Sequence, residues 1–600
     1  MSATTETNAP SFDPEVLREK YRIERDKRMR TDGIAQYQEL TGNFAKFLDD
    51  PHVDEIIARD PIEEELDVVV IGGGFSGLSA GAQLKKAGVT DIRMVEAGGD
   101  FGGTWYWNQY PGVQCDIESY VYLPMLEELD YMPKLKYSYG PEIQSHASNI
   151  GHHFDLYDRA LFQTRVSNLD WNVDTNRWTV STERGDRLHA RFVVVAPGPL
   201  ARPKLPGIPG IQDFAGQMFH TSRWDYDYTG GDTNGGLDKL GDKKVGVVGT
   251  GATAIQCIPH VGEAAEHLYV FQRTPSSVDA RNNKPTDAEW AASLEPGWQD
   301  ERVANFSTFV SGTPVGEDLV NDGWTDIFRK VSVMFSRDEI GSPEEAQKMV
   351  EMADFEKMEE IRSRVDEIVS DPATAEALKP WYRQFCKRPC FHDDYLPTFD
   401  RPNVTLVDTD GKGVEQITKD GVIVGGKEYP LDCLIFATGF EVGTDYSRRA
   451  AMEIRGTTGQ TLTEHWADEV KTFHGLTTDG FPNLFLMGGL QSGVTPNFTE
   501  LYNEQSVHIA YVVGQVLEEP EKVFEATREA VSDWVGIVKE TAYSNNDFAE
   551  TCTPGYYNNE GKPGVGPGWF GGSYGGGAQA FFALLREWRE QGGLEGFDRR

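Results

Sequence analysis

The sequence predicts an α/β fold built around two Rossmann-like dinucleotide-binding domains. Two continuous apolar runs, ELDVVVI at 65–71 and KVGVV at 244–248, have the character of buried parallel strands. Each run leads into a glycine cluster, a helix-like segment and a second strand, at 91–96 and 267–272 respectively. Strand, glycine turn, helix and strand in this order form a βαβ unit, and two such units predict two separate domains.

The length and charge of the chain limit what else it can be. At 600 residues it exceeds the roughly 250–300 residues that one hydrophobic core supports, so more than one domain is expected. The 57 Lys and Arg residues against 95 Asp and Glu residues give a formal net charge of −38. Such an acidic chain should repel a nucleic-acid backbone and an anionic membrane surface, so we expect neither as a partner.

Targeting and cysteine patterns indicate a cytoplasmic protein. No segment approaches the ~18 uninterrupted apolar residues of a membrane span, and residues 1–15 lack the basic-then-apolar pattern of a signal peptide. Six cysteines in this length do not make a disulfide scaffold, so we expect reduced thiols. Cys386 and Cys390 form the closest pair, but the other ligands of a zinc site are missing, so we expect no metal.

The order of these patterns predicts that each domain is assembled from two segments of the chain. Residues 280–380 are mostly helix-like and acidic, and Ser342-Pro343-Glu344-Glu345 should begin one helix that ends near Val369. The expected organisation is a largely helical N-terminal extension (1–60), the first domain (61–200 and 431–600), the second domain (201–279 and 381–430) and a helical insertion (280–380).

The first glycine motif, Gly72-x-Gly74-x-x-Gly77, follows its strand directly. Gly72 permits a tight turn, Gly74 lets the backbone approach a pyrophosphate, and Gly77 lets the helix pack closely on the strand. The helix N-terminus favours the anion, and Glu96 ends the next strand, where an acid binds ribose hydroxyls. A glycine turn without a ligand is the alternative, but this context favours a flavin dinucleotide, FAD.

The second motif, residues 249–254, reads GTGATA, with alanine in the place of the third glycine, which the motif permits. The strand that follows ends in Arg273-Thr274 rather than in an acid. An arginine there suits a 2′-phosphate through charge-assisted hydrogen bonds, so we predict that the second domain binds NADPH. The alternative is that Arg273 is an ordinary surface charge. The motif residues expected at this cofactor are Gly249, Gly251, Thr253 and Ala254.

A longer pattern between the two motifs resembles a known enzyme family. The run Phe214-x-Gly216-x-x-x-His220-x-x-x-Trp224-Asp225 is similar to the fingerprint of type I Baeyer–Villiger monooxygenases, which use FAD and NADPH. Related flavin monooxygenases that oxidise soft heteroatoms carry Tyr-Lys at the end of this pattern, so Trp224-Asp225 favours the Baeyer–Villiger family. His220 has two interpretations, a catalytic one and a structural one in which it couples the domains.

Three further patterns occur in the family's order, so the resemblance covers residues from about 65 to 600: Gly103-Thr104-Trp105, Tyr110-Pro111-Gly112 with Asp116, and Lys387-Arg388-Pro389. Trp105 could belong to the core or to the flavin pocket, and its GGTW context favours the pocket. Two positions depart from the family. Gln109 stands where many relatives carry arginine, and residues 196–200 read APGPL where Ala-Thr-Gly is usual.

The resemblance implies a reaction and a role for each matching residue. In the family NADPH reduces FAD, a flavin C4a-peroxide forms with O2, and one oxygen atom is inserted beside a ketone carbonyl to give an ester or lactone. Arg388 matches the catalytic arginine and Asp116 its paired carboxylate. Arginine suits an anionic peroxide because it does not lose its proton. Lys387 matches a lysine that contacts the 2′-phosphate together with Arg273 and Thr274, while Gly103, Thr104, Trp105 and Asp116 are expected at the FAD.

The resemblance also indicates a substrate class. Residues 553–559, TPGYYNN, are similar to a loop that closes the substrate pocket in relatives acting on bulky, steroid or large-ring ketones, and the N-terminal extension indicates the same subgroup. Two alternatives remain: an N- or S-oxygenating flavin monooxygenase, and an uncoupled NADPH oxidase or redox flavoprotein. We expect a monomer or a small homo-oligomer.

Overall fold

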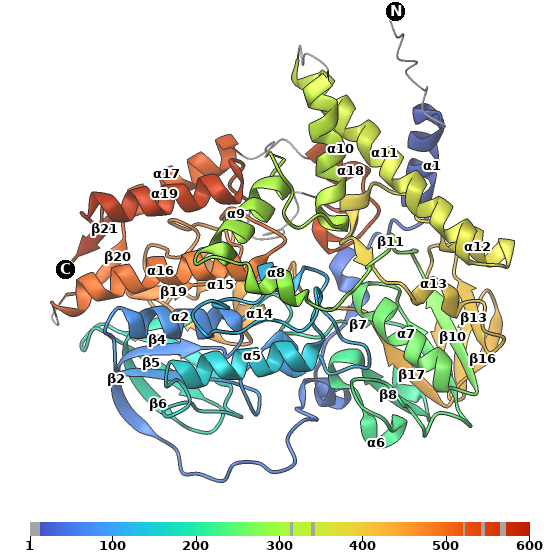
Figure 1. Cartoon of the computed structure of the whole chain (residues 1–600). Helices are drawn as coiled ribbons and strands as arrows, with labels where there is room; N and C mark the ends of the chain where they lie inside the picture. Colours follow the sequence, from blue (N-terminus) through green and yellow to red (C-terminus); the bar gives the residue numbers. More distant parts are fainter. Residues whose placement is uncertain (1–11, 313–315, 338–341, 520–521, 542–545, 564–571) are drawn as a thin grey trace, which may run out of the picture.

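The computed structural model describes residues 12–312, 316–337, 342–519, 522–541, 546–563 and 572–600. Its two largest sheets have seven and five strands, and each contains one of the predicted βαβ units. Figure 1 shows the first sheet at the lower left and the second at the right. The predicted α/β fold with two Rossmann-type units is therefore confirmed.

The first sheet contains β2 (Glu63–Ile71), which pairs in parallel with β3 (Ile92–Val95) at the edge and with β6 (Arg187–Val195) on its other side. Both faces of β2 are buried, because Val68 and Val70 pack into one hydrophobic cluster while Val69 and Ile71 pack into another. This explains its continuous apolar run. The remaining strands are β19 (Leu484–Leu486), β5 (Arg177–Thr182), β4 (Val166–Asn172) and β18 (Glu453–Arg455).

A layer of helices packs on this sheet (Figure 1). Helix α2 (Phe75–Lys86) follows β2 and packs against α16 (Phe498–Leu517) and α5 (Gly140–His153). Nine of its twelve residues are buried, because neighbouring elements enclose it almost completely. Two short helices, α3 (Thr104–Trp107) and α4 (Ser119–Tyr122), lead from β3 toward the site.

The second sheet is entirely parallel, in the order β13-β10-β9-β17-β8. Its strands are β13 (Val404–Asp408), β10 (His267–Gln272), β9 (Lys244–Val248), β17 (Cys433–Phe436) and β8 (Gln217–His220), with α7 (Ala252–Ala264) between β9 and β10. The sequence placed residues 431–600 with the first domain, whereas β17 pairs with β9 and β8 here. A four-residue apolar strand fits either sheet, so its pattern does not reveal its partner.

The insertion between the two halves of the second domain is helical, as predicted. In Figure 1 its helices from Gly323 onward lie above the second domain, whereas its first two helices lie over the first domain. Helix α11 runs over Pro343–Ile368, and the Ser342 side chain accepts a hydrogen bond from Glu345 N, so the predicted helix start and end are confirmed. The other helices are α8 (Ala288–Ala292), α9 (Trp298–Val310), α10 (Gly323–Arg337) and α12 (Pro372–Leu378).

The described part of the N-terminal extension, residues 12–60, is helical only in part. Helix α1 (Pro14–Asp26) packs on α11, with Leu17 and Tyr21 against Phe355, and beyond it only two 3₁₀ turns are helical. The extension then adds strand β1 (Tyr37–Gln38) to β7 (Leu205–Pro206). Aromatic and aliphatic side chains of residues 40–48 pack on the second sheet, so this segment is part of the second domain's core.

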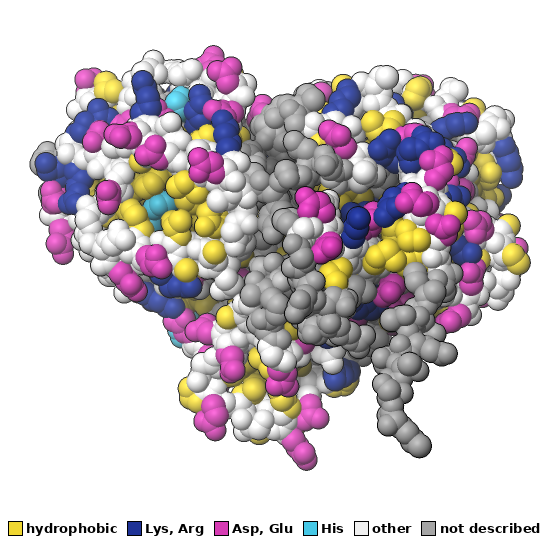
Figure 2. Space-filling view, turned by 90° about the horizontal axis from the view of Figure 1, so that it is seen from above, with side chains coloured by type: hydrophobic (Ala, Val, Ile, Leu, Met, Phe, Trp, Pro, Cys, Tyr) yellow, Lys and Arg dark blue, Asp and Glu magenta, His cyan; other side chains and the backbone are white. Residues whose placement is uncertain are grey.

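The C-terminal part adds α17 (Arg528–Thr541), α19 (Gly577–Gln591) and the strand pair β20 (Phe524–Ala526) and β21 (Phe597–Arg599) to the first domain. Between them, α18 (Asn546–Thr551) and the 3₁₀ segment η6 (Tyr556–Gly561) contact the N-terminal extension. Figure 2 shows acidic and basic side chains interspersed over the face seen from above. Within the described ranges, no helix combines the length and the apolar character needed to cross a membrane.

Candidate active site

A large cavity of about 1620 Å³ contains most of the predicted site residues. Both glycine loops, the segment around Arg388 and the C-terminal loop that includes Tyr556 and Tyr557 line it. Small-molecule sites usually occupy about 300–1,000 Å³, so this cavity has room for more than one ligand.

The first glycine loop is shaped by contacts that exclude side chains. Gly72 has φ +108°, and a Cβ there would lie 2.3 Å from the carbonyl oxygen of Ala196. A Cβ on Gly77 would lie 1.8 Å from the carbonyl oxygen of Gly72. Gly72 and Gly74 line the cavity, whereas Gly77 lies behind it, where α2 packs on β2. The bare backbone and the N-terminus of α2 therefore face the cavity, as a pyrophosphate requires.

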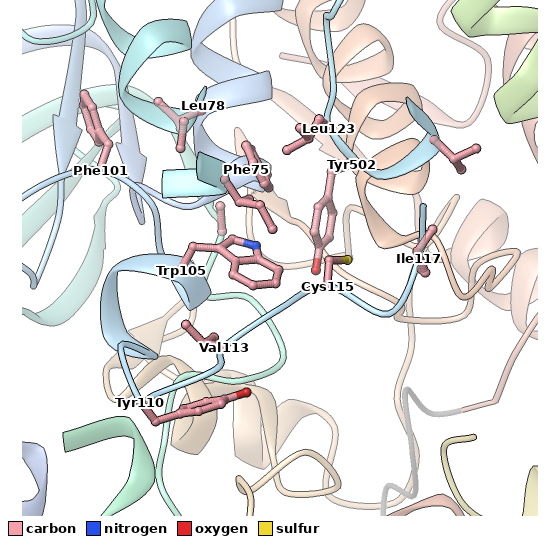
Figure 3. Close-up of a cluster of buried hydrophobic side chains, with 14 of the residues drawn as sticks. Phe75, Leu78, Phe101, Trp105, Tyr110, Val113, Cys115, Ile117, Leu123 and Tyr502 are labelled. Carbon is pink, nitrogen blue, oxygen red and sulfur yellow. The ribbon is translucent and has the colours of Figure 1, made fainter. Parts of the chain in front are cut away.

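The Gly103-Thr104-Trp105 segment closes over this loop. Gly103 has φ +54°, and a Cβ there would lie 2.6 Å from Gly74 Cα. Trp105 is buried and donates from Nε1 to the Tyr122 hydroxyl at 2.9 Å. Figure 3 shows its ring close to Phe75, with Tyr502 beside them, and all three side chains line the cavity. Trp105 therefore belongs both to the hydrophobic core and to the lining of the cavity.

Glu96 lies at the end of β3 and lines the cavity, as the motif predicts. Its two carboxylate oxygens accept hydrogen bonds from Gly73 N and Gly98 N. Burial raises the pKa of Glu96, although these two backbone donors counteract it. A carboxylate has about four acceptor positions, so Glu96 can also accept from ribose hydroxyls.

The second glycine loop repeats this construction. Gly249 has φ +118°, and a Cβ there would lie 2.4 Å from the carbonyl oxygen of Ala437. Gly251 has no atom near its Cβ position and, like Thr253, borders the cavity. Ala254, which replaces the third glycine, is fully buried in α7 and does not line the cavity. Like Gly77 in the first loop, Ala254 therefore packs inside the domain and does not face the ligand site.

Arg388 and Asp116 form a two-bond ion pair in the cavity wall. Arg388 Nε donates to Asp116 Oδ2 at 2.7 Å, and Nη2 donates to Oδ1 at 2.6 Å. Burial alone would lower the pKa of the Arg388 guanidinium, but the Asp116 carboxylate raises it well above its ordinary value. The Arg388 side chain keeps 30% of its surface accessible, so a fixed positive charge is available inside the cavity.

Two residues that support this pair were not predicted. Trp324, from the helical insertion, donates from Nε1 to the Asp116 carbonyl at 3.0 Å, and the Arg388 guanidinium lies 5.1 Å from its ring centroid. Arg281 donates to the carbonyl oxygen of Cys115 at 2.6 Å and so fixes the adjacent backbone. No local sequence signal marks either residue, because both act across more than 150 residues of sequence.

All three predicted 2′-phosphate residues line the cavity. The Thr274 hydroxyl is buried and has no hydrogen-bond partner among the described residues. Arg273 donates to Gln36 Oε1 at 2.8 Å, and Lys387 donates to the Pro554 carbonyl at 3.0 Å. Burial and the nearby Arg273 charge lower the pKa of Lys387 to about 8. An unpaired hydroxyl beside an arginine and a lysine fits a phosphate group.

The C-terminal loop is attached to the arginine segment by a disulfide that we did not predict. Cys386, which precedes Lys387 and Arg388, is bonded to Cys552, which precedes the 553–559 loop. The expectation of reduced thiols is therefore wrong for this pair, while Cys115, Cys257, Cys390 and Cys433 are free. The two bonded cysteines lie 166 residues apart, so spacing gave no signal.

The fingerprint residues lie outside the cavity lining. His220 is fully buried, its Nδ1 lies 2.8 Å from Ser222 Oγ and its Nε2 lies 3.1 Å from the Gly439 carbonyl. Burial lowers the pKa of His220 to about 3. Trp224 is buried as well, and Asp225 caps the short helix α6 (Tyr226–Thr229). These contacts favour the structural interpretation of His220.

The positions that depart from the family have local roles. Gln109 donates to the Tyr106 carbonyl at 2.9 Å and is absent from the cavity lining. Ala196 continues the first sheet through its N–H bond to Ile71 O at 2.8 Å and borders the cavity. Neither departure changes the Arg388–Asp116 pair.

Comparison with known proteins agrees with this geometry. Residues 66–295 match the family model described as pyridine nucleotide-disulphide oxidoreductase. The chain is 52% identical to neopentalenolactone D synthase of Streptomyces avermitilis, covering 98% of this chain and 99% of the relative. It is 50% identical to a Baeyer–Villiger monooxygenase of Stachybotrys chlorohalonatus, covering 98% and 94%.

A solved structure agrees as well. The polycyclic ketone monooxygenase of Thermothelomyces thermophila superimposes with a TM-score of 0.90 at 37% identity, covering 98% of this chain and 99% of that one. The residues present fit FAD and NADPH. The two glycine loops offer bare backbone to a pyrophosphate, Glu96 at the end of β3 can accept from ribose hydroxyls, and the unpaired Thr274 hydroxyl lies beside two cations, as a 2′-phosphate requires. The chain belongs to the type I Baeyer–Villiger monooxygenases, the flavoenzymes that use FAD, NADPH and O2 to insert an oxygen atom beside a ketone carbonyl.

Proposed function

We propose that this Baeyer–Villiger monooxygenase converts a bulky, polycyclic ketone to its lactone or ester in the cavity described above, with Arg388 as its catalytic residue. The observation that carries the proposal is the Arg388–Asp116 pair, which points a permanent positive charge into a cavity that also receives both glycine loops. Bound FAD, once reduced by NADPH, supplies the activated oxygen. The residues of the chain supply binding, orientation and charge.

Arg388 would stabilise negative charge that develops at the reacting oxygen atoms. A guanidinium keeps its proton throughout the working pH range, so it stabilises an anion without protonating it. Asp116 occupies the Nε and Nη2 side of the guanidinium, and the Tyr557 side chain also hydrogen-bonds to Arg388, so the reacting groups would approach the guanidinium beside Tyr557. Trp324 stacks against the guanidinium and limits its movement.

The cofactor roles follow the two loops. We assign FAD to the first domain, with its pyrophosphate at Gly72 and Gly74, a ribose at Glu96 and its isoalloxazine end near Trp105 and Asp116. We assign NADPH to the second domain, with its pyrophosphate at Gly249 and Gly251. The group expected at its 2′-phosphate is Arg273, Thr274 and Lys387, supported by the unpaired Thr274 hydroxyl.

The substrate class rests on the cavity and on the relatives. Two relatives at 52% identity are named for pentalenolactone-type products, and the solved structure at 37% identity is that of a polycyclic ketone monooxygenase. Tyr556 and Tyr557 form the wall of the cavity that faces Arg388. We propose that this wall contacts the fused rings of the ketone and holds its carbonyl near the guanidinium.

The experiment that tests the substrate class uses ketones of increasing ring number. Purified holoenzyme with NADPH is offered monocyclic, bicyclic and tricyclic ketones, and products are identified by mass spectrometry. The proposal predicts that kcat/KM rises from monocyclic to tricyclic ketones. Highest kcat/KM for a small monocyclic ketone would contradict it.

We further propose that the enzyme works in the cytoplasm, where NADPH is supplied, as a monomer or small homo-oligomer. A disulfide is uncommon in that compartment, but Cys386 and Cys552 are only 2% and 3% exposed, which shields them from soluble thiols. Light scattering of the holoenzyme measures the oligomeric state, and a mass above that of a small oligomer would contradict the proposal.

A further inference from the structure

An acidic side chain lies inside the proposed 2′-phosphate pocket. Glu560, in the C-terminal loop, is 4% exposed, and its Oε1 lies 3.4 Å from Lys204 Nζ. Its Oε2 lies 3.6 Å from Arg273 Nη2. Tyr37, from the N-terminal extension, donates its hydroxyl to Glu560 Oε1 at 2.8 Å. Three distant parts of the chain therefore converge on one carboxylate.

The cations around Glu560 outnumber the acids. Lys204 is buried, with its ammonium 4.2 Å from the Tyr37 ring centroid, and Arg273 and Lys387 lie close enough to affect each other's charge. Glu441, the next acid near Lys204, is already paired with Arg202 and Arg448. Among the described residues, three cations thus face one carboxylate, which leaves two positive charges for a ligand.

That excess matches the charge of a phosphate monoester. A phosphate monoester carries about −1.5 to −2 at pH 7, since its second pKa is near 6. Together with Glu560 it would neutralise Lys204, Arg273 and Lys387. Lys204 does not belong to any motif found in the sequence, and Glu560 lies just beyond the predicted 553–559 loop.

The N-terminal extension fixes the same group from the other side. Arg28 donates from Nε to the Arg273 carbonyl at 3.1 Å, and Gln36 accepts from the Arg273 guanidinium. Arg28 is itself paired with Glu24, so its charge is compensated. The extension therefore holds both Arg273 and, through Tyr37, Glu560.

We propose that Glu560 is a positioning residue for the 2′-phosphate of NADPH: held by Tyr37, it keeps Lys204 and Arg273 at the pocket, so that tight NADPH binding depends on the C-terminal loop. This inference rests on the proposed assignment of Arg273, Thr274 and Lys387 to that phosphate. It gives the N-terminal extension and the C-terminal loop a shared task, discrimination of NADPH from NADH.

The test compares binding of nucleotides to the FAD-loaded, full-length protein by calorimetry. The variant is Glu560→Gln, and the ligands are NADP⁺, NAD⁺ and, as the isolated probe, 2′,5′-ADP against 5′-AMP. Loss of one charged hydrogen-bonding group is worth about 1.5–3 kcal/mol, which corresponds to at least about tenfold. We expect Kd for NADP⁺ and 2′,5′-ADP to rise at least about tenfold, with Kd for NAD⁺ and 5′-AMP changed less than about twofold.

Three controls separate positioning from general damage to the loop. Glu550→Gln removes the same charge from an exposed side chain near the loop and should leave all Kd values unchanged. Tyr37→Phe removes only the hydroxyl that holds Glu560 and should weaken NADP⁺ in the same direction by a smaller factor. FAD content and thermal midpoint report folding, and Lys204→Met provides a second variant if Glu560→Gln loses FAD.

Different results test the role of Glu560 and the 2′-phosphate site on which that role depends. Equal weakening of NADP⁺ and NAD⁺ by Glu560→Gln, no change, or tighter NADP⁺ binding would overturn the role of Glu560. The same comparison on Arg273→Ala tests the pocket itself. If Arg273→Ala leaves the NADP⁺ to NAD⁺ ratio unchanged, the proposed 2′-phosphate site is wrong; if only Glu560→Gln leaves it unchanged, the site stands and the inference fails.

Discussion

Arg388 and Asp116 are 272 residues apart in sequence, yet they meet through two parallel hydrogen bonds of 2.7 and 2.6 Å. Asp116 comes from the first domain, and Arg388 follows the helical insertion of the second. A bidentate pair of this kind fixes the plane of the guanidinium as well as its position. The arginine that we propose as catalytic is therefore correctly placed only when the two domains are assembled.

Removal of the Arg388 charge should separate the two halves of the reaction. In Arg388→Ala we expect NADPH to reduce the flavin at close to the normal rate, while oxygenation of ketone falls by about 10²–10³-fold. Arg388→Lys keeps the charge but loses the two-bond fork, so it should recover only part of the loss. Stopped-flow absorbance measures flavin reduction and product analysis measures oxygenation. Normal lactone formation by Arg388→Ala would rule out its catalytic role.

Arg273 should matter for one nicotinamide cofactor and not for the other. Arg273→Ala removes a charged donor worth about 1.5–3 kcal/mol, so KM for NADPH should rise at least about tenfold. NADH lacks the 2′-phosphate, so its KM should hardly change. Steady-state kinetics with each cofactor provides the comparison, and equal increases in both KM values would remove the 2′-phosphate role.

Lys387 predicts a pH dependence of NADP⁺ binding. Its pKa is lowered to about 8, so the ammonium is charged below that pH and loses its proton above it. A charged Lys387 attracts the phosphate, so NADP⁺ should bind tightly at pH 7 and progressively more weakly as the pH rises beyond about 8. NAD⁺ should show a flat profile, and Lys387→Met should flatten that of NADP⁺. A sloping NAD⁺ profile would contradict this explanation.

The glycine loops provide a matched pair of substitutions. Gly77→Ala places a Cβ 1.8 Å from the Gly72 carbonyl oxygen, so the variant should lose FAD and fold poorly. Gly251→Ala meets no atom within 4 Å, so it should fold and keep FAD, and it should weaken nucleotide binding only through its approach to the pyrophosphate. Flavin absorbance and thermal unfolding distinguish them. Full FAD occupancy in Gly77→Ala would show that α2 can move away from β2.

The disulfide makes a quantitative prediction for thiols. Protein denatured without a reductant should expose four thiols, and six after reduction, because Cys386 and Cys552 are bonded. Cys552→Ser should lower the thermal midpoint, since loss of a native disulfide typically costs about 2–5 kcal/mol. It should also lower affinity for NADP⁺, because the C-terminal loop loses its covalent attachment beside Lys387. Six thiols before reduction would exclude the bond.

Local motifs predicted those parts of the protein in which neighbouring residues act together. A few consecutive residues determine the tight turns at Gly72 and Gly249 and the helix start at Ser342, so these features could be predicted. Arg388 and Asp116 could be paired only because the resemblance linked them. Nothing in the sequence alone indicates that residues so far apart meet.

The features that sequence reasoning missed all depend on tertiary contacts. The strand Cys433–Phe436 belongs to the second sheet because it pairs in parallel with both β8 and β9, and Cys386 meets Cys552 only after the C-terminal loop has folded back. Lys204 and Glu560 have no motif, and their proximity comes from the same return of the C-terminal loop. A lysine or a glutamate in a sequence is usually a surface residue, so neither indicates a site until the structure shows the two buried together.

The most direct test of the central claim uses labelled oxygen. Holoenzyme, NADPH, ¹⁸O2 and a tricyclic ketone are incubated, and the products of wild type and Arg388→Ala are compared by mass spectrometry. We predict a lactone or ester with one labelled oxygen from wild type, and recovered ketone with hydrogen peroxide from Arg388→Ala. Peroxide alone from wild type, with every ketone recovered, or a labelled lactone from both proteins, would contradict the assignment of oxygen insertion to the Arg388 site.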